Sequence, residues 1–125
     1  MSVKVLVVDD SMMVRRQVGA ALGQAGFDVE EAKDGIEALE VLRRINDVAL
    51  VVCDVNMPRM DGLEFLQSVR DDRTLSGISV VMLTTEGKVD YVRRAKELGA
   101  KAWIVKPFNA DLLVAAVRKA TASAA

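Results

Sequence analysis

The stretch that decides the fold is Val3-Lys4-Val5-Leu6-Val7-Val8-Asp9-Asp10-Ser11, residues 3–11. Its first part is almost wholly aliphatic and rich in valine, and it ends in two adjacent carboxylates. A continuous apolar run of this length is typical of a strand that is buried on both faces, as in a parallel sheet. The stretch therefore predicts a buried parallel strand with acidic groups at its carboxyl end.

Similar runs recur along the chain and alternate with longer stretches of helical period. We expect three more buried strands over Ala49 to Val52, Ser79 to Leu83 and Ala102 to Val105, and an edge strand over the more polar Phe27 to Ala32. Strict alternation of strands and helices calls for a parallel sheet with right-handed crossovers and helices on both faces. The pattern thus predicts the α/β class, as a (βα)5 doubly wound parallel five-stranded sheet.

The predicted helices carry recognisable ends and apolar faces. Asp34 with Glu37 three residues later indicates a capping box, and Asn109 is placed to cap the last helix. Gly26 and Gly99 fall where helix C-termini favour glycine. A further helix is expected over residues 62–68. Inward faces are predicted for three helices, over Val14, Val18, Ala21, Leu22 and Ala25, over Val89, Val92, Ala95 and Leu98, and over Leu112, Leu113, Ala116 and Val117.

Composition limits the functions open to the chain. Its 125 residues, 51% of them hydrophobic, suffice for a real core, so we expect one domain over residues 1–125. A formal net charge of -1 provides no field for direct nucleic-acid binding. No apolar stretch approaches the ~20 residues that a membrane span needs, and the lone Cys53 lies in an apolar run. We expect a protein of the reducing cytoplasm without membrane insertion.

Polar side chains gather where the predicted strands end. Asp9-Asp10, Asp54, Thr84-Thr85 and Lys106-Pro107 follow four different strands, and the carboxyl edge of an open α/β sheet is where ligands bind. Each group alone could be a turn or cap residue. Crowding three carboxylates together is unfavourable without a cation, however, and oxygen ligands without histidine favour Mg²⁺. Because the chain has no histidine, any phosphoryl-donating imidazole must belong to another molecule.

Four strings of residues resemble CheY-like response-regulator receiver domains over essentially the whole chain: Val5-Leu6-Val7-Val8-Asp9-Asp10-Ser11, Cys53-Asp54-Val55-Asn56-Met57-Pro58-Arg59-Met60-Asp61-Gly62, Leu83-Thr84-Thr85-Glu86 and Lys106-Pro107-Phe108. The resemblance implies a flavodoxin-like sheet with strand order 2-1-3-4-5. It also implies a role in two-component signalling, with Mg²⁺-dependent phosphorylation and no turnover of an external substrate.

The resemblance assigns roles to the residues at the strand ends. Asp54 would be the phosphoacceptor, a carboxylate nucleophile once substrate and metal are aligned. Asp9, Asp10, Asp54 and the backbone carbonyl of Asn56 would hold Mg²⁺, with Asp9 acting through a bound water. Lys106 would pair with a phosphoryl oxygen, and the bond between it and the following proline would be cis, as in the family.

A switch follows by the same resemblance. Thr84 would hydrogen-bond the phosphoryl group, and Trp103 occupies an aromatic switch position where relatives carry Tyr or Phe. The alternative is that Trp103 is a half-buried anchor. Asn56 and Glu86 would tune dephosphorylation. The expected output surface is the fourth helix, fifth strand and fifth helix, with Lys88, Tyr91, Lys101, Trp103 and Lys119.

The expected partners are a sensor histidine kinase or histidine phosphotransfer protein as donor and a downstream protein effector. We expect a monomer of the chemotaxis type, by analogy only. A receiver cut from a longer regulator remains open. A module that has lost phosphorylation is disfavoured, because every expected acidic, hydroxyl and lysine position is filled. A small haloacid-dehalogenase-like phosphatase is disfavoured because Asn56 cannot serve as its general acid, and a flavin or nucleotide binder because residues 9–12 lack a glycine-rich phosphate cradle.

Overall fold

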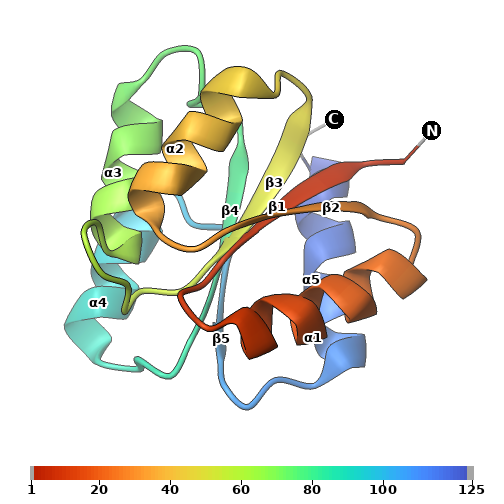
Figure 1. The fold of residues 1–125 in the computed structure, drawn as a ribbon. Coiled ribbons are helices and arrows are strands. Elements are labelled where there is room, and N and C mark those ends of the chain that lie inside the picture. Colours follow the sequence, from red (N-terminus) through yellow and green to blue (C-terminus); the bar gives the residue numbers. More distant parts are fainter. Residues whose placement is uncertain (1, 124–125) are drawn as a thin grey trace.

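The computed structural model describes residues 2–123 as five strands alternating with five helices (Figure 1). The strands are β1 (Lys4–Val8), β2 (Asp28–Ala32), β3 (Val48–Cys53), β4 (Ser79–Thr84) and β5 (Ala102–Val105). The helices are α1 (Met12–Gln24), α2 (Gly35–Arg44), α3 (Gly62–Asp71), α4 (Val89–Glu97) and α5 (Ala110–Ser123). The predicted alternation is confirmed, with ends that shift by one to a few residues.

All strands pair in parallel, in the order β2-β1-β3-β4-β5. This order confirms the doubly wound flavodoxin-like sheet and places β2 at one edge, as its polar composition predicted. β5 forms the other edge. The expectation of a buried strand over Ala102 to Val105 is therefore wrong, because an edge strand has a neighbour on one side only, and Val105 is 50% exposed. The chain order reverses between β1 and β3, and at such a switch point the loops diverge and leave room for a ligand.

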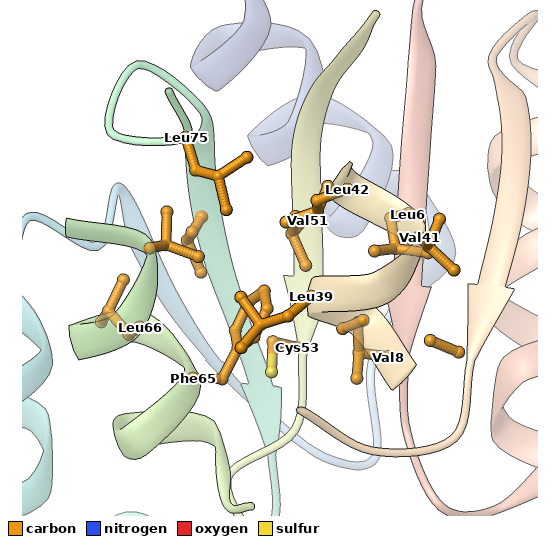
Figure 2. Packing of buried hydrophobic residues seen from close by; sticks show 14 of the residues in the cluster. Leu6, Val8, Leu39, Val41, Leu42, Val51, Cys53, Phe65, Leu66 and Leu75 are labelled. Carbon is orange, nitrogen blue, oxygen red and sulfur yellow. The ribbon is translucent and has the colours of Figure 1, made fainter. Parts of the chain in front are cut away.

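Two apolar cores lie on the two faces of the sheet, since successive strand residues point to opposite sides. In β1, Leu6 and Val8 belong to one core, and Val5 and Val7 to the other. Helices α2, α3 and α4 cover the first face, whereas α1 and α5 cover the second (Figure 1). Figure 2 shows the first core, where fully buried Phe65 lies among aliphatic side chains from α2 and the central strands.

The prediction of an inward side chain is wrong for two residues. Val89 is 70% exposed because it opens α4 at the N-terminal end, and the buried side of that helix centres on Ala95. Leu112 is 68% exposed because α5 directs Leu113 and Val117 into the core. A step of one residue turns a helix by about 100°, so Leu112 lies outside that buried face.

Local signals set most helix ends. Asn109 Oδ1 accepts from the backbone amides of Asp111 (2.9 Å) and Leu112 (3.2 Å), which confirms the cap of α5. Gly26 and Gly99 have φ values of 97° and 85°, the left-handed conformation that glycine adopts most easily. Among residues 2–123, no helix is both long and apolar enough to cross a membrane.

The capping box predicted for α2 is only half formed. The Asp34 side chain accepts from the amide of Glu37 at 2.9 Å, but the Glu37 carboxylate accepts from Lys33 instead of from the cap residue. A complete capping box occurs one helix later, where Asp61 and Glu64 exchange both bonds at the start of α3. The α3 cap fixes the end of the loop that follows β3.

Candidate functional site

The backbone at the carboxyl edge carries the strand pairing slightly beyond the strands. The amide of Asp9 donates to Ala32 (3.2 Å), and the amide of Asp54 donates to Val8 (3.0 Å). The amide of Lys106 donates to the carbonyl of Thr84 at 2.9 Å. These bonds extend the sheet pairing to the residues after β1, β3 and β5, which places those residues at the same edge of the sheet.

Three carboxylates meet there. Asp9, Asp10 and Asp54 each offer an oxygen, and these oxygens lie within 4.8 Å of one another. Asp9 and Asp54 are buried, whereas Asp10 is exposed. Such a set, open to solvent on one side, fits a hard cation that keeps several of its waters. The predicted clustering of these three residues is therefore observed, and oxygen donors are the ligands that such an ion prefers.

Lys106 supplies the positive charge in the cluster. Its Nζ lies 2.6 Å from Asp9 Oδ2 and 3.4 Å from Asp54 Oδ2. Burial lowers the pKa of Lys106, but the hydrogen bond to Asp9 and the charges of Asp54 and Asp9 outweigh burial and raise it above its ordinary value. Burial raises the pKa of Asp9 above its ordinary value, although the Lys106 ammonium opposes this change. The cluster thus holds three carboxylates and one ammonium, which contacts two of them, and a cation would offset the remaining negative charge.

The peptide bond between Lys106 and Pro107 is cis, as the family resemblance implied.

The residues at the start of α1 also hold the cluster in place. The amide of Ser11 donates to Asp9 Oδ1 at 2.9 Å, and Arg15 donates to the carbonyl of Asp9 at 2.7 Å. Sequence reasoning missed Arg15, because a charged residue on a helix gives no signal of the carbonyl it will meet.

The loop between β4 and α4 is held through the backbone of Glu86. Its amide donates to the hydroxyl of the fully buried Thr84 at 3.2 Å. Its carbonyl accepts from the indole Nε1 of Trp103, on β5, at 2.9 Å. Thr84 and Trp103, the two predicted switch residues, thus bind the backbone of the same residue, Glu86, from neighbouring strands. The Glu86 carboxylate accepts from the amide of Lys88, at the start of α4.

Asn56 lies two residues beyond Asp54 and its side chain is exposed. Its backbone amide donates a hydrogen bond to Asp54 Oδ1 at 3.3 Å. Gly62, at the start of α3, donates its amide to the carbonyl of Val55 at 2.8 Å, and a Cβ at Gly62 would collide with the carbonyl oxygen of Asp54. The backbone of Asp54 therefore leaves no room for a side chain at position 62.

A second ion pair beside this loop has no counterpart in the sequence prediction. Arg59 binds the Asp34 carboxylate with two hydrogen bonds, Nε to Oδ2 at 2.8 Å and a terminal nitrogen to Oδ1 at 3.0 Å. Asp34 is buried, and the Arg59 guanidinium lowers its pKa. The two residues are 25 positions apart, so no local pattern links them.

The residues of the expected output surface are spread over α4, β5 and α5. Lys88, Lys101 and Lys119 are exposed, Tyr91 is 37% exposed and Trp103 is half-buried. The Lys88 ammonium lies 5.7 Å from the centroid of the Tyr91 ring, within reach of a cation–π interaction.

Comparison with known families accounts for this arrangement. The response regulator receiver domain family matches residues 5–118. The chain belongs to this family. Receivers of the family are signalling phosphoacceptors rather than turnover enzymes, so the phosphatase alternative is excluded, and membership implies a histidine kinase as the phosphoryl donor.

Chemotaxis proteins are among the relatives that this receiver resembles over most of its length. It is 41% identical over 111 residues to chemotaxis protein CheY1 of Helicobacter pylori, covering 88% of this chain and 90% of that protein. It is 40% identical over 111 residues to a chemotaxis protein CheY homolog of Campylobacter jejuni, covering 88% and 85%. The structure of the chemotaxis response regulator CheY4 of Vibrio cholerae superposes on it with a TM-score of 0.88 at 38% identity, over 96% of this chain and 99% of that one.

Proposed function

We propose that Asp54 is the residue of this receiver that accepts the phosphoryl group, in a site completed by Mg²⁺. The observation that carries the proposal is the meeting of Asp9, Asp10 and Asp54 within 4.8 Å, with the Lys106 ammonium against two of them. Asp54 is the member that follows β3, at the centre of the sheet and beside the switch point. Its carboxylate would attack phosphorus in the donor and become an aspartyl phosphate as the donor group leaves.

Asp9, Asp10, Asp54 and the backbone carbonyl of Asn56 would hold the cation. Carboxylate and carbonyl oxygens fit Mg²⁺, and so does the exposure of Asp10, because Mg²⁺ keeps several waters. When bound, the ion supplies positive charge that offsets repulsion between the acceptor carboxylate and an incoming phosphoryl group. Lys106 would act in the same sense as a point charge on a phosphoryl oxygen.

Phosphorylation would be read out through Thr84 and Trp103. The Thr84 hydroxyl is buried at the end of β4 and accepts a hydrogen bond from the Glu86 backbone amide. The hydroxyl would donate its own proton to a phosphoryl oxygen on Asp54, which would draw Thr84 and the attached Glu86 backbone toward the site. Any movement of Glu86 reaches Trp103 through the indole hydrogen bond. We propose that the surface of α4, β5 and α5 then binds a protein effector, and that Asn56 and Glu86 tune dephosphorylation.

The similarity to chemotaxis proteins supports a chemotaxis-type regulator that acts in the cytoplasm as one receiver domain over residues 1–125. Its donor would be a sensor histidine kinase or a histidine phosphotransfer protein, because the chain itself has no histidine. We further propose that it acts as a monomer.

The test is labelling with acetyl phosphate in the presence of Mg²⁺. Wild-type protein should gain one phosphoryl group that hydroxylamine removes, since acyl phosphates react with that nucleophile. The Asp54→Asn variant should fall to background, because a carboxamide is a poor nucleophile. Chelating Mg²⁺ should reduce wild-type labelling to the same background.

The matched control is Asp71→Asn, which removes one exposed carboxylate at the far end of α3. This variant should be labelled like the wild type. Full labelling of Asp54→Asn would disprove the site, and unchanged labelling in chelator would disprove the metal.

A further inference from the structure

The loop from β3 to α3, residues 55–61, contains a strained turn next to the candidate phosphoacceptor. Arg59 has φ of 65°, and it is the one residue other than glycine with positive φ among residues 2–123. The amide of Met60 donates to the carbonyl of Pro58 at 2.7 Å, which closes a three-residue turn centred on Arg59. A turn of this kind with positive φ is rare and strained, and such strain persists only where surrounding contacts hold it.

The contacts that hold the turn come from the segment before α2. The two hydrogen bonds from Arg59 to Asp34 have donor–acceptor distances of 2.8 and 3.0 Å, the range of strong charge-assisted bonds. The next residue, Gly35, donates its amide to the carbonyl of Met60 at 3.3 Å. A Cβ at Gly35 would lie 2.7 Å from Met60 Cγ, so a larger residue would force the Met60 side chain to shift.

The Asp34 carboxylate is unusually well placed to act as an anchor. Its side chain is only 2% exposed, and it also caps α2 through the amide of Glu37. It therefore cannot move without exposing the first turn of that helix. The Arg59 side chain, in contrast, is 54% exposed and is free to leave if its partner is removed. The ion pair thus ties an exposed side chain on a strained turn to a buried carboxylate at the start of a neighbouring helix.

Both ends of the loop contact the candidate phosphoacceptor or the residue next to it. The Asn56 amide donates to Asp54 Oδ1, and Gly62 packs against the backbone of Asp54 and Val55. The loop is consequently held at both ends and at its strained centre. If Arg59 relaxed to negative φ, the chain on either side would have to shift, and residues 56–58 have only the Asp54 end to resist that shift.

We infer that Arg59, through its ion pair with Asp34, is a positioning residue that holds residues 55–58 in the conformation required for cation binding and phosphorylation at Asp54. This inference rests on the proposed function, since it assigns Arg59 a role toward that site. Arg59 contacts neither Asp54 nor the cation, and its effect is transmitted through the loop backbone.

The experiment compares Arg59→Asn, Asp34→Asn and the double variant. Asparagine tolerates positive φ, so Arg59→Asn removes the ion pair without adding strain. Asparagine is also a good N-cap, so Asp34→Asn removes the charge but preserves the cap. Affinity for Mg²⁺ is measured by titration with MgCl₂, followed by NMR of the backbone amides of Val55 and Asn56. Stability is measured separately by urea unfolding.

Each single variant should bind Mg²⁺ about 10-fold more weakly, the lower end of the loss typical when a residue that supports metal ligands is removed. The double variant should be no weaker than the singles, because both changes break the same ion pair. Acetyl phosphate labelling at limiting Mg²⁺ should slow in parallel. Arg43→Gln removes another exposed arginine that pairs with an aspartate, Asp72, away from the loop, and should bind Mg²⁺ like the wild type.

A purely structural ion pair would lower the urea midpoint and leave Mg²⁺ affinity unchanged, and that result would overturn the inference. So would additive losses in the double variant, because they would show that the two residues act independently. These outcomes are distinct from failure of the proposed function, which would appear as labelling of Asp54→Asn. If Asp54→Asn is not labelled but Arg59→Asn keeps wild-type affinity, only the role of Arg59 is disproved.

Discussion

At the scale of single residues, burial and charge act against each other in this receiver. Lys106 and Asp9 form a close ion pair in a half-enclosed site, and burial affects both partners. Removing one partner of such a pair leaves an uncompensated charge, which is more harmful than the loss of an exposed pair. The Lys106 ammonium therefore offsets part of the repulsion between the carboxylates. The remaining negative charge would attract a cation.

The buried Asp34 leads to a prediction about pH. Its pKa is lowered by the hydrogen bond and charge of Arg59, so it is lower in the folded protein than in the unfolded chain. A depressed folded pKa contributes stability that is complete above the unfolded value of about 3.9 and is lost as the pH falls through the folded value. The Asp34→Asn variant should lose this contribution at neutral pH and show a shallower decline in stability on acidification.

The measurement is the urea midpoint of both proteins from neutral pH down to about pH 3, a span that includes the ordinary carboxyl pKa. The two curves should converge as the solution becomes acidic. Parallel curves over the whole span would contradict the assignment, since they would mean that protonation of Asp34 does not contribute to acid unfolding.

At the scale of elements, a small number of specific hydrogen bonds holds the two loops that follow β3 and β4. In the β4–α4 loop, Thr84 binds the backbone amide of Glu86 and Trp103 binds its carbonyl. The β3–α3 loop ends in a complete capping box at Asp61. Because few hydrogen bonds hold each loop, the gain or loss of a single bond can change the conformation of the loop. Changes of this kind underlie many phosphorylation switches.

Trp103 is the single tryptophan of the chain and can report on the β4–α4 loop. Beryllofluoride with Mg²⁺, a phosphoryl mimic at Asp54, should change its fluorescence more than Mg²⁺ alone does. A ligand shifts an equilibrium only by its differential affinity for the two states, and the Thr84 contact would exist mainly in the active one. In Thr84→Ala the mimic should still bind, but the fluorescence change should become small.

Acetyl phosphate labelling of Thr84→Ala provides the control, because Asp54, the other carboxylates and Lys106 are intact in that variant. If the variant is labelled and also keeps the full wild-type fluorescence change, then Thr84 does not couple the site to Trp103. The alternative that Trp103 is only an anchor would then be favoured.

At the scale of the whole molecule, stability is shared between two cores on opposite faces of one sheet (Figure 1). Strands β1, β3 and β4 contribute to both cores because their residues alternate between faces. The site lies at the carboxyl edge of this sheet, where three of its four strand-end positions follow central strands. Damage to either core is therefore expected to weaken the frame that holds the site.

Two neighbouring leucines of α5 test how well the buried face is assigned. Leu113 is 0% exposed and Leu112 is 68% exposed. Leu113→Ala should reduce the free energy of unfolding by about 2–5 kcal/mol, as expected for a large-to-small change in a core. Leu112→Ala should change it by less than about 0.5 kcal/mol, as is usual for exposed positions.

Urea unfolding of the two variants measures both values with the same substitution in the same helix. Equal losses would show that Leu112 is also covered in solution and that the exposed surface of α5 is smaller than the structure indicates.

The order of the elements and the location of the site were predictable from the sequence. Apolar runs of β-branched residues indicate strands locally, and the carboxyl ends of parallel strands meet at one edge, so Asp9, Asp10, Asp54, Thr84 and Lys106 could be brought together without coordinates. Caps such as Asn109 and turns such as Gly26 and Gly99 were also predictable, since their hydrogen bonds join residues that are close in sequence.

Other contacts between distant parts of the chain were decided by the tertiary structure alone. The pairing of Asp34 with Arg59, the bond from Trp103 to Glu86 and the contact of Arg15 with Asp9 join separate elements, and each depends on how those elements pack. The exposure of Leu112 was likewise decided by the rotation of α5 against the sheet. The spacing of apolar residues predicts roughly which side of a helix is buried. Packing decides which residues at the border of that side are covered, and which partner each long polar side chain meets.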